Sequence, residues 1–119
     1  MTVHRGDIVL LNFPFSSGTG AKVRPALVVQ SDVNNRRLRN TIVAMVTSRA
    51  DRAKAEATQL LITLATPTGH SSGLLHDSAV KCENLFTVEQ TLIRRVIGRL
   101  PAETMAQVDR CLEVSVGLR

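Results

Sequence analysis

The feature that most constrains the fold is a series of short apolar segments rich in β-branched residues, none longer than six residues. Most of them are bounded by glycine, proline, asparagine, aspartate or serine, residue types that favour turns. Segments of this length and composition are typical of β-strands. The predicted strands are residues 8–13, 26–30, 41–46, 60–64, 78–83 (extended by 85–88 after a kink) and 95–99.

The C-terminal end of the chain has the periodicity of a helix. Pro101 suits a first helical position, and Met105, Val108 and Leu112 follow at a spacing of three to four. Residues 15–23 and 67–73 are predicted loops, and residues 32–40 a basic connection with about one helical turn. A mainly β protein with α, folded as one small antiparallel barrel over residues 1–119, is therefore expected.

Positive charge is concentrated in the first half of the chain. Residues 8–50 contain six basic side chains and one acidic one, whereas residues 51–119 contain eight of each. A phosphate-bearing partner would explain this excess, and a solvated basic face is the alternative. The sequence lacks both the apolar run of about 18 residues that crosses a membrane and a signal-peptide pattern. A cytoplasmic protein is expected.

Several kinds of site are excluded by the sequence. It contains no glycine-rich phosphate loop, no carboxylates at metal-site spacing and no recognisable Ser-His-Asp set. Neither a metal nor another cofactor is expected. With no Trp, no Tyr and three Phe, a broad base-stacking surface is impossible, and Phe15 is the best single stacking candidate. Cys82 and Cys111 are expected to be reduced and buried.

A set of short motifs occurs in a specific order along nearly the whole chain. They are residues 5–9, 13–14, 24–29, 42–48, 78–88 and 98–100. In this order they resemble the MazF/PemK family of toxin ribonucleases. The resemblance implies an SH3-like barrel with a C-terminal helix, a homodimer, and metal-independent cleavage of single-stranded RNA. It also implies neutralisation by an acidic antitoxin whose tail lies across the site.

The resemblance assigns catalytic roles to Arg24 and Thr47. When a ribose hydroxyl attacks its own phosphate, negative charge builds on the phosphoryl oxygens. Arg24 could hold two of these oxygens through paired charged donors, and Thr47 could add one hydrogen bond. The alternative is that Arg24 is an ordinary surface ion-pair partner and Thr47 a strand-end residue.

The group that accepts the proton is left open by the sequence. Arginine, with a pKa above about 12, is a poor acceptor at neutral pH. Some relatives carry a carboxylate in the first loop, but residues 8–31 contain none. Glu83, followed by Asn84 where relatives carry Gln, is the third catalytic candidate; it either accepts the proton or pairs with Lys81 on the same strand face. Exposed or structural roles are expected for all three histidines, of which His76, beside Asp77, is the best nuclease candidate.

The candidates for RNA binding share a basic, hydroxyl, amide or aromatic side chain. They are Phe15, Lys22, Arg36, Arg37, Ser48, Arg49, Ser78, Lys81 and Asn84. Arg36 and Arg37 either hold the RNA backbone or only keep the surface soluble. Two other functions stay open: a gyrase-poisoning toxin on the same barrel, and a non-catalytic RNA-binding barrel.

Overall fold

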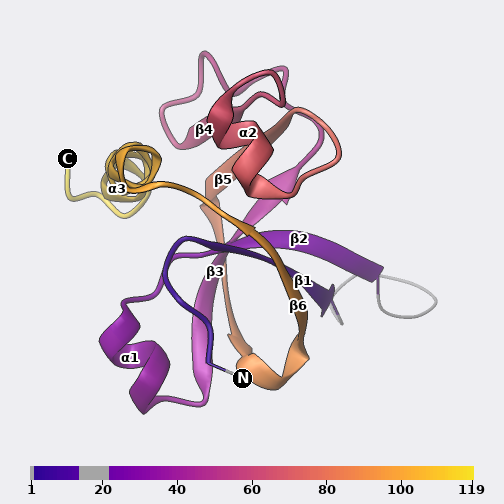
Figure 1. Cartoon of the computed structure of the whole chain (residues 1–119). Coiled ribbons are helices and arrows are strands. Elements are labelled where there is room, and N and C mark those ends of the chain that lie inside the picture. The colour runs from indigo at the N-terminus through magenta and orange to yellow at the C-terminus, as the bar shows by residue number, and fades with distance from the viewer. Residues whose placement is uncertain (1, 14–21) are drawn as a thin grey trace.

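The computed structural model describes residues 2–13 and 22–119, which form six strands and a few short helices around them (Figure 1). The elements are β1 (Asp7–Phe13), β2 (Lys22–Val28), α1 (Asp32–Arg37), β3 (Asn40–Thr47), β4 (Gln59–Ile62), α2 (Pro67–Ser72), β5 (Ser78–Glu89), the single 3-10 turn η1 (Gln90–Leu92), β6 (Ile93–Arg99) and α3 (Ala102–Ser115). All six predicted strands, the short basic helix and the C-terminal helix are confirmed. Within the described residues, no helix is long and apolar enough to cross a membrane.

The six strands form one antiparallel sheet in the order β4-β5-β3-β2-β1-β6. The protein is thus mainly β with α, as predicted. The long strands β3 and β5 run side by side through the length of the molecule, and the shorter β1, β2 and β6 cross in front of them (Figure 1). This arrangement gives β3 two distinct ends, one next to α1 and one next to β4 and α2.

The sheet has a hydrophobic core on each face. One core packs α3 against the sheet and includes Ile8, Leu27, Val46, Val80, Cys82, Met105, Val108 and Cys111. The other lies on the opposite side of the strands and includes Val3, Val9, Leu11, Phe13, Val28, Val43, Val88 and Ile93. Because side chains alternate along a strand, β1 contributes to both cores, as its nearly continuous apolar run predicts. Both cysteines are free and buried, as predicted.

The prediction of a loop at residues 67–73 is wrong, because Pro67–Ser72 form the helix α2. The Thr66 hydroxyl accepts a hydrogen bond from the Gly69 amide at 3.1 Å, which caps the helix, and Pro67 suits its first turn. Gly73 ends the helix in the left-handed region at φ +73°. The cap at Thr66, the proline of the first turn and the glycine at the end outweigh the turn preference of the small residues between them.

Candidate functional site

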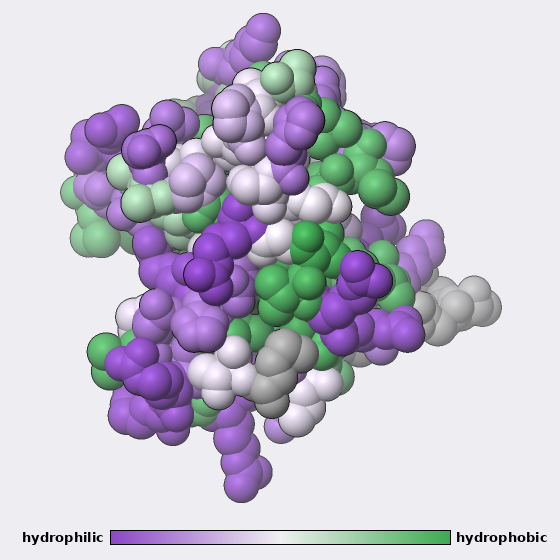
Figure 2. All heavy atoms as spheres, viewed as in Figure 1, coloured by the Kyte–Doolittle hydropathy of each residue, from purple (hydrophilic) through white to green (hydrophobic). Residues whose placement is uncertain are grey.

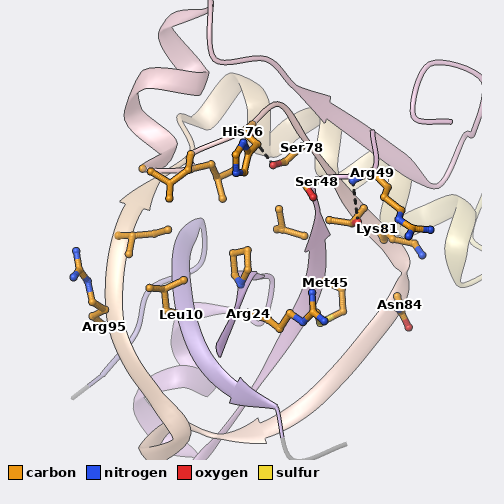
Figure 3. Close-up of a pocket in the computed structure, with 17 residues that line it drawn as sticks. Leu10, Arg24, Met45, Ser48, Arg49, His76, Ser78, Lys81, Asn84 and Arg95 are labelled. Carbon is orange, nitrogen blue, oxygen red and sulfur yellow. Dashed lines mark hydrogen bonds between the residues drawn. The ribbon is translucent and has the colours of Figure 1, made fainter. Parts of the chain in front are cut away.

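A cavity of about 700 Å³ opens where β2 and β3 cease to pair (Figure 3). The β2–β3 ladder covers only Ala26–Val28. Pro25, the next residue outward, has no amide hydrogen with which to extend the ladder. The lining residues come from β1, β2, the end of β3, the segment after α2, β5 and β6: Leu10, Arg24, Pro25, Met45, Val46, Thr47, Ser48, Arg49, Gly73, Leu74, Leu75, His76, Ser78, Lys81, Asn84, Arg95 and Ile97.

Seven of the candidate site residues line this one cavity. They are Arg24, Thr47, Ser48, Arg49, Ser78, Lys81 and Asn84. They come from three segments that are far apart in the sequence, and Figure 3 shows Arg24 beside Met45 with Arg49 and Lys81 to one side. The antiparallel pairing of β3 with β5, which places Thr47 opposite Ala79, brings two of these segments together.

The charge of the cavity is entirely positive. Arg24, Arg49, Lys81 and Arg95 line it, and none of the lining residues that the structure describes is acidic. Across residues 2–13 and 22–119, none of these four cations belongs to an ion pair within 4 Å. Four cations that converge without a neutralising carboxylate favour an anionic ligand.

Two hydroxyl groups are held at the edge of the cavity. The Thr47 oxygen accepts a hydrogen bond from the Arg49 amide at 3.1 Å, which leaves its own hydrogen available for donation. The buried Ser78 hydroxyl donates to the carbonyl oxygen of His76 at 2.8 Å. The first contact orders the turn after β3, and the second orders the start of β5.

The cavity also has an apolar wall that the sequence did not predict. Leu10 of β1 and Ile97 of β6 are among its lining residues, together with Leu74 and Leu75. In Figure 2 an apolar patch lies in the middle of the molecular face, over the region of β1 and β6, with hydrophilic side chains around it. Leu75 is 83% exposed, so part of this apolar surface faces solvent.

Sequence reasoning missed Arg95 as a site residue. It ranked His76 first among the histidines as a nuclease candidate but expected an exposed or structural role for it. Arg95 and Ile97 of β6 both line the cavity, but Ile97 is an extra residue between Val96, which pairs with Val9, and Gly98, which pairs with Ile8. Strand alternation alone therefore does not place them on one face. His76 reaches the cavity because α2 packs directly on the backbone of β6, a contact between residues too far apart in sequence for any pattern to reveal.

Glu83 does not line the cavity. The β3–β5 register places Ala44 opposite Leu85 and Met45 opposite Lys81, so residues 82–84 form a bulge, which confirms the predicted kink. Within the bulge, Glu83 Oε2 accepts a hydrogen bond from Gln59 Nε2 at 2.8 Å. Burial raises the pKa of Glu83, but the hydrogen bonds from Gln59 and Thr58 and the nearby Lys81 charge lower it overall. The carboxylate is bonded to Gln59 rather than directed at the cavity.

The remaining candidates lie elsewhere. Arg36 and Arg37 are on α1, next to the Asn40 end of β3, whereas Thr47 is at the other end, roughly 23 Å away along an extended strand. Lys22 is exposed at the start of β2, on the same strand face as Arg24, and is not among the lining residues. Phe15 lies outside the described residues. His4 and His70 are exposed and outside the cavity.

No metal centre accompanies the cavity in the part of the chain that the structure describes. There, no three His, Cys, Asp or Glu side chains lie close enough together to hold a metal ion. The site consists of guanidinium, ammonium, hydroxyl, amide and imidazole groups around an open space. These groups can bind an anion, donate hydrogen bonds and exchange a proton.

Comparison with known proteins gives a consistent result. Residues 4–116 match the family model described as PemK-like, MazF-like toxin of type II toxin-antitoxin system. A curated relative, Endoribonuclease EndoA of Bacillus subtilis (strain 168), is 31% identical over 119 residues, covering 99% of this chain and 97% of the relative.

Solved structures share the fold at lower sequence identity. A mycobacterial endoribonuclease in complex with its cognate antitoxin superposes with a TM-score of 0.78 at 18% identity, covering 98% of this chain and 97% of that one. The Mycobacterium tuberculosis toxin MazF-mt6 gives 0.75 at 23% identity, with 95% and 98% covered. A MazE–MazF structure from Deinococcus radiodurans gives 0.74 at 23% identity, with 98% of each chain covered.

Proposed function

Because this chain belongs to the family of PemK-like, MazF-like toxins of type II toxin-antitoxin systems, we propose that it is an endoribonuclease that cuts single-stranded RNA without a metal ion. The observation that carries the proposal is the cavity whose lining, in the described part of the chain, has four cations and no acidic residue. A phosphodiester is the anion that such a cavity fits. The name of the Bacillus relative, an endoribonuclease at 31% identity, supports the same activity.

The proposed roles follow from the geometry of the donors. Arg24 holds two phosphoryl oxygens with its planar fork, and Thr47 donates one further hydrogen bond, so both stabilise charge that grows in the transition state. Arg49 and Lys81 bind the flanking phosphates, and Ser48 and Asn84 supply neutral hydrogen bonds. The Ser78 oxygen, whose hydrogen is donated to the His76 carbonyl oxygen, can accept one from the RNA. A cavity of about 700 Å³ lies in the range of roughly 300–1,000 Å³ that holds ligands of nucleotide size.

The proposed reaction uses the RNA's own ribose hydroxyl as nucleophile. The 2′-oxygen forms a bond to phosphorus, and the bond from phosphorus to the 5′-oxygen of the next nucleotide breaks. The products are a 2′,3′-cyclic phosphate, or a 3′-phosphate after hydrolysis, and a free 5′-hydroxyl. Arg24 and Thr47 stabilise the charge that develops on the phosphoryl oxygens, and because the nucleophile belongs to the RNA, the reaction needs no metal-bound water.

The test is incubation of the purified protein with mixed-sequence RNA in excess chelator, followed by sequencing of the fragment ends. We expect cleavage, with cyclic phosphate or 3′-phosphate on one fragment and 5′-hydroxyl on the other. Intact RNA would contradict the proposal and favour the gyrase poison or the non-catalytic RNA-binding barrel. Cleavage that stops on addition of chelator would contradict the metal-independent mechanism.

The proposed partner is a cognate acidic antitoxin, since a carboxylate-rich tail offers anionic oxygens to the same arginines as RNA does. The mycobacterial relative has been solved in complex with its cognate antitoxin. We further propose a cytoplasmic homodimer of one domain whose curved sheet is an SH3-like barrel. The exposed Leu75 beside other apolar lining residues favours a second copy as the cover of this surface. Light scattering at micromolar concentration would show the dimer.

A further inference from the structure

The proposed cleavage needs a group that accepts the proton of the ribose hydroxyl, and the cavity contains few groups able to do so. Its ionisable lining residues are Arg24, Arg49, Lys81, Arg95 and His76. Arginine and lysine side chains are ordinarily protonated at neutral pH and cannot accept another proton. Histidine is the side chain that ordinarily gains and loses a proton near neutrality.

Residues 14–21, which lie outside the described part of the chain, do not add an alternative. Their sequence, Pro-Phe-Ser-Ser-Gly-Thr-Gly-Ala, contains no acidic residue and no histidine. Glu83 lies outside the cavity lining and is hydrogen-bonded to Gln59. The proton acceptor must therefore be one of the described lining residues, which include the imidazole of His76 and four cations.

We propose that His76 is the general base of RNA cleavage, an inference that rests on the proposed function. Neutral imidazole takes the proton of the 2′-hydroxyl while the 2′-oxygen bonds to phosphorus. The electron pair of the breaking bond goes to the 5′-oxygen, which takes a proton from water in the open cavity. The imidazolium then returns its proton to solvent, so the protein is unchanged after each cycle.

The backbone that carries His76 is fixed on the side of α2. A Cβ atom added to Gly98 would lie 2.2 Å from the Ser72 carbonyl oxygen, and one added to Gly73 would lie 2.0 Å from the Ile97 carbonyl oxygen. Such distances show that the end of α2 lies directly against the backbone of β6, which leaves no room for side chains between them. This close packing restrains the position of the segment from Gly73 to His76 on the cavity wall.

The other side of His76 is fixed by two hydrogen bonds. Ser78 Oγ donates to the His76 carbonyl oxygen at 2.8 Å, and the Leu64 amide donates to Asp77 Oδ1 at 2.8 Å. The Asp77 carboxylate is thus engaged with the chain after β4. The His76 side chain is exposed and lies at the top of the cavity beside Ser78, across from Arg24 (Figure 3). A fixed backbone with an accessible ring suits a side chain that accepts a proton from a bound ligand.

The test compares His76→Gln with His70→Gln, using cleavage rates from pH 5 to 9 and RNA affinity. His70 is a matched control because it is an exposed histidine on α2 outside the cavity lining. For His76→Gln we expect a rate loss on the order of a hundredfold or more with RNA affinity retained. His70→Gln should cleave at the wild-type rate.

The pH profile separates proton transfer from simple positioning. The other charged groups lining the cavity are Arg24 from β2, Arg49 after β3, Lys81 from β5 and Arg95 from β6, and Asp77 is adjacent in the chain. Side chains of arginine, lysine and aspartate ordinarily do not titrate between about pH 5 and 9. The wild-type rate should therefore fall on the acidic side as the imidazole is protonated, and this fall should be absent in His76→Gln.

Chemical rescue completes the test. His76→Gly should regain cleavage when imidazole is added, and Arg24→Lys should not. The inference would be overturned if His76→Gln cleaved RNA at the wild-type rate. It would also be overturned if the variant were slower but its rate still decreased at acidic pH. In both cases cleavage by the wild-type protein would leave the proposed function intact. Failure of the wild-type protein to cleave RNA would instead overturn the proposed function itself.

Discussion

Charged side chains serve opposite purposes at the N-terminal turn and in the cavity. At the turn, Asp7 is 2% exposed, accepts a hydrogen bond from the His4 amide at 2.8 Å and forms an ion pair with Arg99 at 3.0 Å. Arg5 forms an ion pair with Asp109 of α3 and donates from Nε to the Val29 carbonyl oxygen at 2.9 Å. Each of these charges has a partner within the chain, and together they tie the N-terminus to α3 and the sheet.

The cavity contains arginine and lysine side chains that have no such partners among the described residues. Among the described residues, Arg24, Arg49, Lys81 and Arg95 belong to no ion pair within 4 Å. Leaving four like charges together costs stability, since each repels the others. The difference indicates that charge at the turn stabilises the fold, whereas under the proposed function the unpaired charge in the cavity binds RNA. Substitutions in the two regions should accordingly separate stability from activity.

The largest expected effect on activity comes from Arg24→Lys. Lysine keeps the positive charge but loses the planar pair of donors, so the loss should appear in the cleavage rate rather than in RNA affinity. A lost transition-state donor typically costs on the order of a hundredfold or more. The measurement is single-turnover cleavage at saturating protein, with melting temperature as a check on folding.

Arg94→Lys is the matched control for Arg24→Lys. Arg94 is exposed on β6 and is not among the cavity residues, although its neighbour Arg95 is. We expect this variant to cleave RNA at the wild-type rate. If Arg24→Lys also cleaved at that rate, the cavity would not be the active site and the comparison of the two regions would fail.

The next effect concerns stability and comes from Asp7→Asn at the N-terminal turn. The amide keeps the shape of the carboxylate but leaves the Arg99 partner without its countercharge. Loss of a buried charged partner should lower the free energy of unfolding by about 1–3 kcal/mol. Urea unfolding measures this change, and Asp51→Asn, at an exposed position, is the control. A reduced cleavage rate per folded molecule would show that the turn also contributes to the site.

Thr47→Val should have a smaller effect on activity than Arg24→Lys. Valine has a similar shape, but it removes one neutral hydrogen bond, worth about 1 kcal/mol and so somewhat less than tenfold in rate. It also removes the acceptor of the Arg49 amide. Cleavage kinetics measure the effect, with Thr87→Val on the exposed part of β5 as control. A loss as large as that of Arg24→Lys would mean that Thr47 does more than donate one hydrogen bond.

The strands and most of the cavity cations were predictable because both depend on local sequence. Most strands are short apolar runs that contain β-branched residues, and Arg24 and Thr47 lie in motifs that resemble a known family. Helix α2 was missed because Thr66, Pro67 and Gly73 act through capping geometry, which overrides the turn preference of the small residues between them. Capping patterns in very short helices resemble turn patterns in sequence.

Positions set by long-range contacts could not be predicted. His76 is placed by the close approach of Gly73 and Gly98, which are 25 residues apart in sequence. Glu83 is directed away by the bulge at residues 82–84, whose register depends on the pairing of β3 with β5. From strand alternation alone, Lys81 and Glu83 share a face. The bulge breaks that alternation, and only one of the two residues lines the cavity.

The smallest expected effect comes from Glu83→Gln, which tests whether this carboxylate belongs with the partnered charges or with the cavity. Burial alone would raise the pKa of Glu83. Hydrogen bonds from Gln59 and Thr58 and the Lys81 charge outweigh this effect, so the pKa is lowered in the folded protein. A lowered folded-state pKa means that the carboxylate contributes stability above its unfolded pKa of about 4.3 and loses it as pH falls through the folded value.

The melting temperature of Glu83→Gln should therefore lie slightly below that of the wild-type protein at pH 7, and the two should converge as the pH falls below the folded-state pKa of Glu83. The difference should be small because the side chain is exposed, and ion pairs and charged hydrogen bonds at the surface are weak. Cleavage should be nearly unchanged, because Glu83 is bonded to Gln59 outside the cavity. Loss of cleavage with an unchanged melting temperature would give the proton-accepting role to Glu83 instead of His76, and would place Glu83 with the groups that serve the ligand.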